Sequence, residues 1–272
     1  MPEQPLPPSQ PATQFELLNT RTYLAGGYDT AIVPIGSCES HGDHLPFGMD
    51  ALTAHALALR VGALVPHCMV LPPTFFGMSH HYRHQPMTIS LSSATTIALF
   101  RDIFESLALA GIERIFVLNG HDGNIPCWET AARDTKLAHP QLKLAGVDWW
   151  VPVGQLCPPD LFEVWSGWGH GGEAETSMGL ALFAQWVDMA HARGAIPKVD
   201  GLIKEIWLFE ELTPNGATGA PGKATVEKGR CMADTVVNYI AQYLIAQRSN
   251  RQGYDPQPTP SAGLSAAGSA AS

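Results

Sequence analysis

Residues 30–50 read TAIVPIGSCESHGDHLPFGMD, and this stretch decides the fold class. The short apolar run at 30–35 is typical of a strand that is buried on both faces. A polar loop follows it, and a helical pattern then extends over about residues 50–65. A buried strand that leads through a polar loop into a helix is the first half of a βαβ unit.

The rest of the chain repeats this alternation. Further strands are predicted over residues 68–71, 114–118 and 142–147, and further helices over 93–110, 125–138, 173–183 and 227–247. Strands that alternate with helices form parallel sheets whose two faces are both covered. We therefore predict an α/β fold, namely a three-layer α/β/α sandwich with a mostly parallel central sheet. In such folds ligands bind where the strands end and the loops begin.

The length of 272 residues allows one large α/β domain. A chain this long buries about three quarters of its surface on folding, so its core needs no disulfides. Residues 1–13 are rich in Pro and Gln, and residues 249–272 contain almost nothing that could pack. We predict disordered tails at 1–13 and 249–272 around a single catalytic domain over 14–248.

The composition argues against several classes of partner. Sixteen basic against 25 acidic residues give a net charge of -9, and the sequence has no Lys/Arg cluster. Both features argue against binding to nucleic acid or to an anionic membrane. No apolar run reaches the roughly 18 residues of a membrane span, and the first residues lack the basic and apolar regions of a signal peptide. Five cysteines without a CxxC pair are typical of a reducing compartment, so we expect a cytoplasmic protein. Only 15% of residues are charged, which favours subunit contacts and a homo-oligomer.

Three polar motifs follow the predicted strands. They read PIGSCESHGDHLPFGMD at 34–50, NGHDGN at 119–124 and GHGGEAETS at 169–177. Because parallel strands end at one edge of a sheet, we expect these motifs to share one pocket. Mixed His and carboxylate ligands suit Zn²⁺ or Mn²⁺, and shared carboxylates suit a two-metal site. Taken singly, each motif has a plainer interpretation as a solvated turn, or as acids at a helix start that favour the positive end of the dipole.

These three motifs, in this order, resemble those of the creatininase family, and the resemblance covers about residues 30–185. It implies an α/β/α fold, a homohexamer, and a centre with two Zn²⁺ or Mn²⁺ ions per subunit. It also implies hydrolysis of a C–N bond in a small cyclic amide or formamide. By position in the motifs, the implied ligands of one metal are Glu39 and His121, that of the other is His41, and Asp50 bridges the two. His170 matches the histidine beside the metal-activated water, the expected proton shuttle.

The second motif departs from the family's pattern. Creatinine-hydrolysing members carry NGHYEN, whereas this chain has Asp122 and Gly123 in place of Tyr and Glu. Gly123 has no side chain to bind a metal. We therefore assign Glu175 to the second metal, with Asp122 as the weaker substitute, and we expect a substrate other than creatinine. At 85–88 the chain reads QPMT where the family usually reads FPGT, so we expect Met87 to reshape a pocket wall.

Other residues are candidates for the pocket itself. Trp150 and Trp168 match aromatic positions that line the family's pocket and lid, although a tryptophan can also simply pack in the core. Ser79 and His80 lie on the long loop after the second predicted strand, with His81 and His84, and are candidate substrate contacts or surface residues. His44 is expected to support the site by hydrogen bonding rather than to bind metal. Cys38 is interpreted as a packing residue.

The leading hypothesis is a metal-dependent hydrolase of a cyclic amide, lactam or formamide. In it a metal-activated water attacks the carbonyl carbon and His170 transfers the proton to the leaving group. One alternative keeps the centre but cleaves a C–C bond of a cyclic polyol ketone of the dehydro-inosose type. A second alternative is a non-catalytic metal-binding protein that kept the fold.

Overall fold

The computed structural model describes residues 12–164, 169–200, 202–203 and 205–249. Its centre is a five-stranded sheet with the order β1-β3-β2-β4-β5, in which all neighbouring strands run parallel. The strands are β1 (Thr13–Gln14), β2 (Thr30–Ile35), β3 (Cys68–Val70), β4 (Arg114–Asn119) and β5 (Lys143–Asp148).

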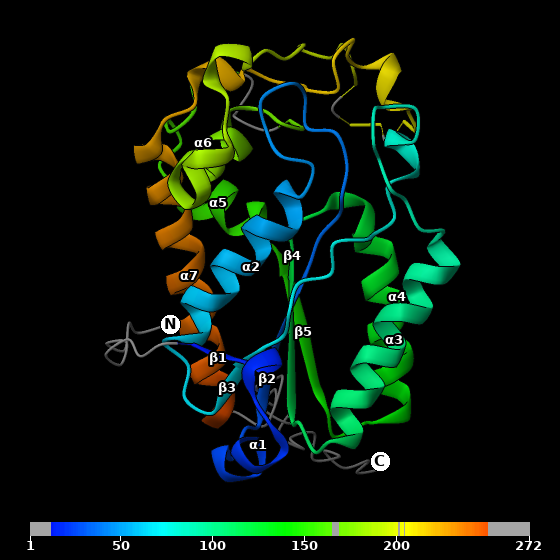
Figure 1. Ribbon diagram of the computed structural model, residues 1–272, viewed down its shortest axis with the longest axis vertical. Helices are drawn as coiled ribbons and strands as arrows, with labels where there is room; N and C mark the ends of the chain where they lie inside the picture. Colours follow the sequence, from blue (N-terminus) through cyan, green and yellow to red (C-terminus); the bar gives the residue numbers. More distant parts are fainter. Residues whose placement is uncertain (1–11, 165–168, 201, 204, 250–272) are drawn as a thin grey trace, which may run out of the picture.

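Helices cover both faces of the sheet (Figure 1). One layer contains α2 (Met49–Gly62), α5 (Trp150–Leu156), α6 (Glu173–Phe183) and α7 (Val226–Ser249), and the other contains α3 (Ser93–Leu109) and α4 (Ile125–Ala138). A short helix, α1 (Thr20–Gly26), precedes β2. The 3₁₀ turns are η1 (Phe15–Leu17), η2 (His80–Tyr82), η3 (Asp122–Asn124), η5 (Ala184–Trp186), η6 (Met189–His191), η7 (Phe209–Glu211) and η8 (Pro221–Lys223).

The alternation of side chains along β2 divides the core in two. Ile32 belongs to the cluster under α2, α6 and α7, whereas Val33 and Ile35 belong to the cluster under α3 and α4. Successive side chains of a strand point to opposite faces, so an uninterrupted apolar run fits a strand with helices on both sides. The prediction of a three-layer α/β/α sandwich is confirmed. None of the described helices is both long and apolar enough to cross a bilayer.

The structure adds elements that the sequence patterns did not predict. These are β1, α1 and α5, of which α5 directly follows β5. The expected N-terminal tail ends inside β1, because Thr13 pairs with Met69, and α7 includes Ser249. The remainder of both expected tails, residues 1–11 and 250–272, lies outside the described residues, as does Trp168.

The register brings the ends of three strands together. Ile35 pairs with Asn119, and Asn119 pairs with Asp148, so β2, β4 and β5 end level with one another. Gly120 follows directly, and a Cβ there would lie 2.3 Å from the carbonyl oxygen of Asp50. Only glycine therefore lets the start of α2 approach the end of β4 this closely. The first two polar motifs meet at this edge.

Candidate metal centre

Asp50, the second residue of α2, lies at the centre of the site. Its Oδ1 is 2.9 Å from Nε2 of His41, and its Oδ2 is 3.0 Å from Nδ1 of His121. Asp50 thereby belongs to two groups of side chains whose ligand atoms lie within 4.8 Å of one another. One group is Glu39, Asp50 and His121, and the other is His41, Asp50 and Glu175.

The first group joins the loops after β2 and β4. Oε1 of Glu39 lies 3.2 Å from Nδ1 of His121, and its Oε2 accepts a hydrogen bond from Ser37 Oγ at 3.0 Å. The Asn119 side chain accepts from the His121 backbone N–H at 3.0 Å and donates to Asp148 of β5 at 2.8 Å. The first asparagine of NGHDGN thus fixes the turn that aims His121 at the carboxylates.

The second group depends on α6. Glu175 lies in the first turn of this helix, and its Oε2 accepts the backbone N–H of Gly171 at 2.5 Å. The same oxygen is 3.9 Å from Nε2 of His41. Asp122 belongs to none of the ligand groups found among the described residues, although it lines the same cavity. The geometry therefore brings Glu175, not Asp122, to His41 and Asp50.

The hydrogen bonds of both imidazoles fit a cation between these groups. Nδ1 of His41 lies 3.1 Å from the backbone oxygen of Glu39, and Nε2 of His121 lies 3.0 Å from that of Met78. A carbonyl oxygen only accepts, so these nitrogens carry the protons, and in the neutral rings the opposite nitrogens turn lone pairs toward carboxylate oxygens. Two of those oxygens, Glu39 Oε1 and Asp50 Oδ2, are buried without a hydrogen-bond donor. Lone pairs converging from rings and carboxylates are the arrangement that a metal ion needs.

Without a bound cation, burial and charge act strongly on these groups. Burial lowers the pKa of His41, but the charge of Asp50 outweighs it and raises that pKa to about 9. Burial raises the pKa of Glu175 to about 7. The pKa of His121 is also raised well above its usual value, by Glu39 and Asp50 against burial. These shifts favour protonated groups in the absence of metal, because three closely spaced carboxylates otherwise repel one another.

His170 stands beside both groups. Its Nε2 lies 2.5 Å from the backbone oxygen of Ser40 and so donates, which leaves Nδ1 as an acceptor 3.7 Å from Oε1 of Glu39. Burial lowers the pKa of His170 well below its usual value, so the ring is neutral. It also forms a third possible ligand group with Glu39 and His41. The geometry therefore allows either a proton acceptor or a ligand at this position.

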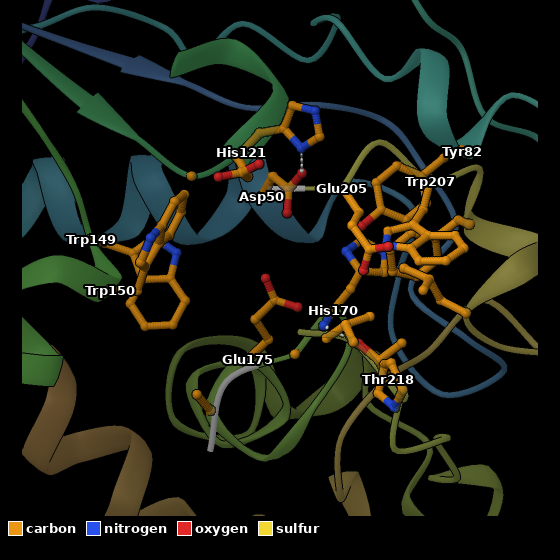
Figure 2. A pocket seen from close by; sticks show the side chains of 18 of the residues that line it. Asp50, Tyr82, His121, Trp149, Trp150, His170, Glu175, Glu205, Trp207 and Thr218 are labelled. Carbon is orange, nitrogen blue, oxygen red and sulfur yellow. Dashed lines mark hydrogen bonds and ion pairs between the residues drawn. The ribbon is translucent and has the colours of Figure 1, made fainter. Parts of the chain in front are cut away.

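These groups lie at a cavity of about 580 Å³ (Figure 2). Trp149 and Trp150 form one side of it, Tyr82, Glu205 and Trp207 form the other, and Asp50, His121 and Glu175 lie between them. A cavity this large holds a small organic molecule beside the metal ligands.

The predicted pocket residues are distributed unevenly around this cavity. Trp150 and Asp122 line it. Ser79 and His80 are not among the lining residues: Ser79 is buried and bonds to Nε2 of His121 at 3.2 Å, and His80 is exposed. Met87 is likewise absent from the lining; its side chain is 68% exposed and its backbone has φ 53°. A left-handed backbone gives a physical reason for the glycine that the family usually has there.

Two buried side chains support the third motif from behind. Nε2 of His44 lies 2.9 Å from Oγ1 of Thr176, and His44 belongs to none of the described ligand groups. Glu173 is fully buried and pairs with Lys228 of α7 at 2.5 Å. Lys228 also contacts Glu163, whose backbone N–H faces the Glu173 carboxylate. These contacts fix the start of α6 and hence the position of Glu175.

The family model for creatininase, described as creatinine amidohydrolase, matches residues 18–244. The chain belongs to the creatininase family. Creatinine amidohydrolase of Pseudomonas putida is 29% identical over 241 residues, which cover 80% of this chain and 89% of that protein. A mycofactocin precursor peptide peptidase of Mycobacterium ulcerans (strain Agy99) is 28% identical over 242 residues, covering 83% and 90%. The crystal structure of a putative creatinine amidohydrolase from Bacteroides fragilis NCTC 9343 has a TM-score of 0.77 at 26% identity, covering 90% of this chain and all of that one.

Other creatininase relatives extend the range of chemistry and metals. A 3-dehydro-scyllo-inosose hydrolase of Thermotoga maritima is 26% identical over 179 residues, which cover 62% of this chain and 55% of that protein. Two creatininase structures, one of a Zn-Zn type and one named for Mn, each match with a TM-score of 0.74 at 25% identity. They cover 89% and 88% of this chain and all of theirs. These relatives are hydrolases or peptidases, and creatininases are known in zinc and manganese forms.

Sequence reasoning missed one wall of the cavity. Tyr82, Trp207 and Phe209 line it, together with described residues between 197 and 212. That segment shows neither helical nor strand periodicity, and no motif marks it. Its clustered aromatic and acidic residues were the available signal, but such clusters are also common on ordinary surfaces.

Proposed function

We propose that this protein is a dinuclear metal-dependent hydrolase that cleaves a C–N bond of a small amide, lactam or formamide. The observation that carries the proposal is the pair of ligand groups sharing Asp50, with buried carboxylate oxygens that lack hydrogen-bond donors, beside a cavity. The relatives named for hydrolysing creatinine, a precursor peptide and a formylamino compound support this class of reaction.

The donor set suits two Zn²⁺ or Mn²⁺ ions. Glu39 and His121 would hold one, His41 and Glu175 the other, and Asp50 both. Imidazole and carboxylate ligands are those that these metals take, and two divalent ions would offset the three negative charges of Glu39, Asp50 and Glu175. Bound there, such a pair would lower the pKa of a water molecule, which makes it a nucleophile at neutral pH, and would polarise the carbonyl group of the substrate.

The chain's own residues supply proton transfer and enclosure. His170 accepts a proton at Nδ1 as the water oxygen bonds to the carbonyl carbon, while Nε2 stays anchored to Ser40. It then gives that proton to the nitrogen as the C–N bond breaks, and this needs no covalent enzyme intermediate. Trp149 and Trp150 shield this chemistry from water, and Asp122 faces the bound substrate.

The alternative reaction uses the same centre on a cyclic polyol ketone. It is favoured by the relative named 3-dehydro-scyllo-inosose hydrolase and by Gly123, which replaces the glutamate of creatinine-hydrolysing members. In that case the water attacks a ring ketone, the C–C bond breaks, and the departing carbon keeps the bond's electron pair and takes the proton that His170 accepted from the water. Both reactions need the same ligands, so substrates must separate them.

One preparation tests the proposal. Metal analysis of the purified protein should find close to two transition metals per subunit. Turnover of creatinine, lactams, N-formyl amines, dipeptides and 3-dehydro-scyllo-inosose should then identify the substrate class. His170→Ala should lower kcat by about 10²–10⁴-fold with both metals retained. Loss of a metal in this variant would make His170 a ligand, and absence of metal from the wild type would refute the centre.

Assembly and compartment are further parts of the proposal. We propose a homohexamer, as the family resemblance implies. Large aliphatic side chains beside the cavity support an oligomer, since Leu202 is 98% and Ile206 is 87% exposed. All five cysteines are free, which supports a reducing, cytoplasmic location. Light scattering of the purified protein measures the subunit number directly.

A further inference from the structure

The phenol of Tyr82 lies at the cavity, and its hydroxyl group has no hydrogen-bond partner among the described residues. Tyr82 ends η2, on the loop after β3, and lines the cavity while only 5% of the residue is exposed. The hydroxyl oxygen is not among the buried side-chain atoms that lack a partner, so it is open to the cavity, where a polar group of a bound molecule can pair with it.

The ring of Tyr82 is held in a cluster of rings, in which the centroids of His170 and Phe209 are also only 4.9 Å apart. The centroids of His41 and His170 are 3.9 Å apart, those of His170 and Tyr82 are 4.1 Å apart, and those of Tyr82 and Phe209 are 4.0 Å apart. Outside this cluster, His84 of the same loop and Glu210 of η7 form an ion pair at 2.6 Å. The phenol therefore has a fixed position next to the proposed proton acceptor, and fixed donors are the ones that stabilise developing charge.

The groups around the ring indicate which kind of atom accepts the hydrogen bond of its hydroxyl group. Its centroid is 4.1 Å from that of His170 and 6.4 Å from that of His121, so the ring lies beside the ligand groups. Burial raises the pKa of Tyr82 above its usual value of about 10, so the phenol is protonated at neutral pH. The groups of the metal centre next to it, namely the carboxylates and Nδ1 of His170, are acceptors. A donor placed among acceptors is suited to an oxygen that gains negative charge.

We propose that Tyr82 is a further catalytic residue, which donates its hydroxyl hydrogen bond to the carbonyl oxygen of the scissile amide. The proposal rests on the hydrolase function proposed above. As the water oxygen bonds to the carbonyl carbon, the C=O π electrons move onto this oxygen, and Tyr82 stabilises the resulting charge. When the C–N bond breaks, the electrons return to re-form C=O and the nitrogen takes its proton from His170. Tyr82 keeps its own proton throughout.

Tyr82→Phe tests the hydroxyl separately from the ring. Phenylalanine keeps the stacking on His170 and Phe209, whereas Tyr82→Leu removes it. Tyr239→Phe on α7, where the residue is 47% exposed and is not among the cavity-lining residues, is the matched control. Each metal-loaded variant is titrated calorimetrically with dimethylphosphinate, a stable anion that copies the tetrahedral carbon and its charged oxygen.

Tyr82→Phe should bind dimethylphosphinate about 10–100-fold more weakly than the wild type, as expected for one lost hydrogen bond to a charged group. On the panel compound that the wild type hydrolyses fastest, kcat should fall about 10²–10³-fold with little change in KM. Metal content and Tm should stay at the values of the wild type and of Tyr239→Phe. Weaker phosphinate binding by Tyr82→Phe, with no panel compound turned over by the wild type, would support the oxyanion site and refute the hydrolase function. Unchanged phosphinate affinity and kcat in Tyr82→Phe, with losses only in Tyr82→Leu, would show that Tyr82 merely packs against His170 and would overturn the proposal.

Discussion

Asp50→Asn should remove both metals, because Asp50 is the one residue that the two proposed ligand groups share. Asparagine keeps the size of the side chain but loses the charge and one anionic oxygen. Free metal at about 100 times Kd stabilises a folded protein by about 2.7 kcal/mol per site, so two sites give roughly 5 kcal/mol. For a domain of this size each kcal/mol shifts Tm by about 2–4 °C, so chelation of the wild type should lower Tm by about 10–20 °C.

The assay is a thermal scan with and without chelator, joined to metal analysis of each protein. Asp50→Asn should show almost no chelator shift, because neither site remains. Glu175→Gln belongs to the second group only and should keep one metal and about half of the shift. Asp122→Asn changes a carboxylate in the same cavity that is in neither group, and it should keep the full shift. A full shift in Asp50→Asn, or a lost one in Asp122→Asn, would refute the assignment of ligands.

Three more outcomes follow from charged groups of the protein. In chelated protein, burial lowers the pKa of His41 but Asp50 raises it to about 9, above the unfolded value of about 6.5. Its contribution to stability is therefore complete below pH 6.5 and is lost as the pH rises to 9, so the Tm of the chelated protein should fall over that range; calorimetry showing a rise would contradict this. Lys228→Ala leaves the fully buried Glu173 carboxylate without its cation and should lower the free energy of unfolding, measured by denaturant titration, by about 3 kcal/mol. Adding Glu173→Gln to the Lys228→Ala variant should restore most of this free energy. A chain of residues 12–249 should keep the full-length Tm. A chain that ends at residue 246 loses Arg248, whose guanidinium contacts the Asp29 carboxylate at 2.7 and 2.6 Å, and should have a measurably lower Tm. Equal Tm values for the two truncated chains would show that this contact adds no stability.

Much of the site could be predicted because it lies where strands end. Glu39 and His41 follow β2, and His121 follows β4. The level ends of these strands bring the three side chains within ligand distance of Asp50. In a parallel sheet, sequence position after a strand is therefore close to position in space. The residues that could not be predicted lie on segments whose direction depends on distant contacts. Ser79 follows β3, but its hydroxyl group bonds to Nε2 of His121 and to the hydroxyl group of Ser37 instead of facing the cavity.

The sequence by itself determined the fold class, the family and the set of metal-ligand candidates. Apolar periodicity and motif order are properties of the sequence that do not depend on tertiary contacts. The motifs already favoured Glu175 over Asp122 as a ligand, but the tertiary structure set its distance to His41, since the packing of α6 against α7 and the Glu173–Lys228 pair set where that helix begins. It also supplied the second wall of the cavity. Tyr82 and Phe209 are 127 residues apart in sequence, yet the centroids of their rings lie 4.0 Å apart. No local pattern encodes that contact, because it exists only after two irregular segments pack over the ends of the strands.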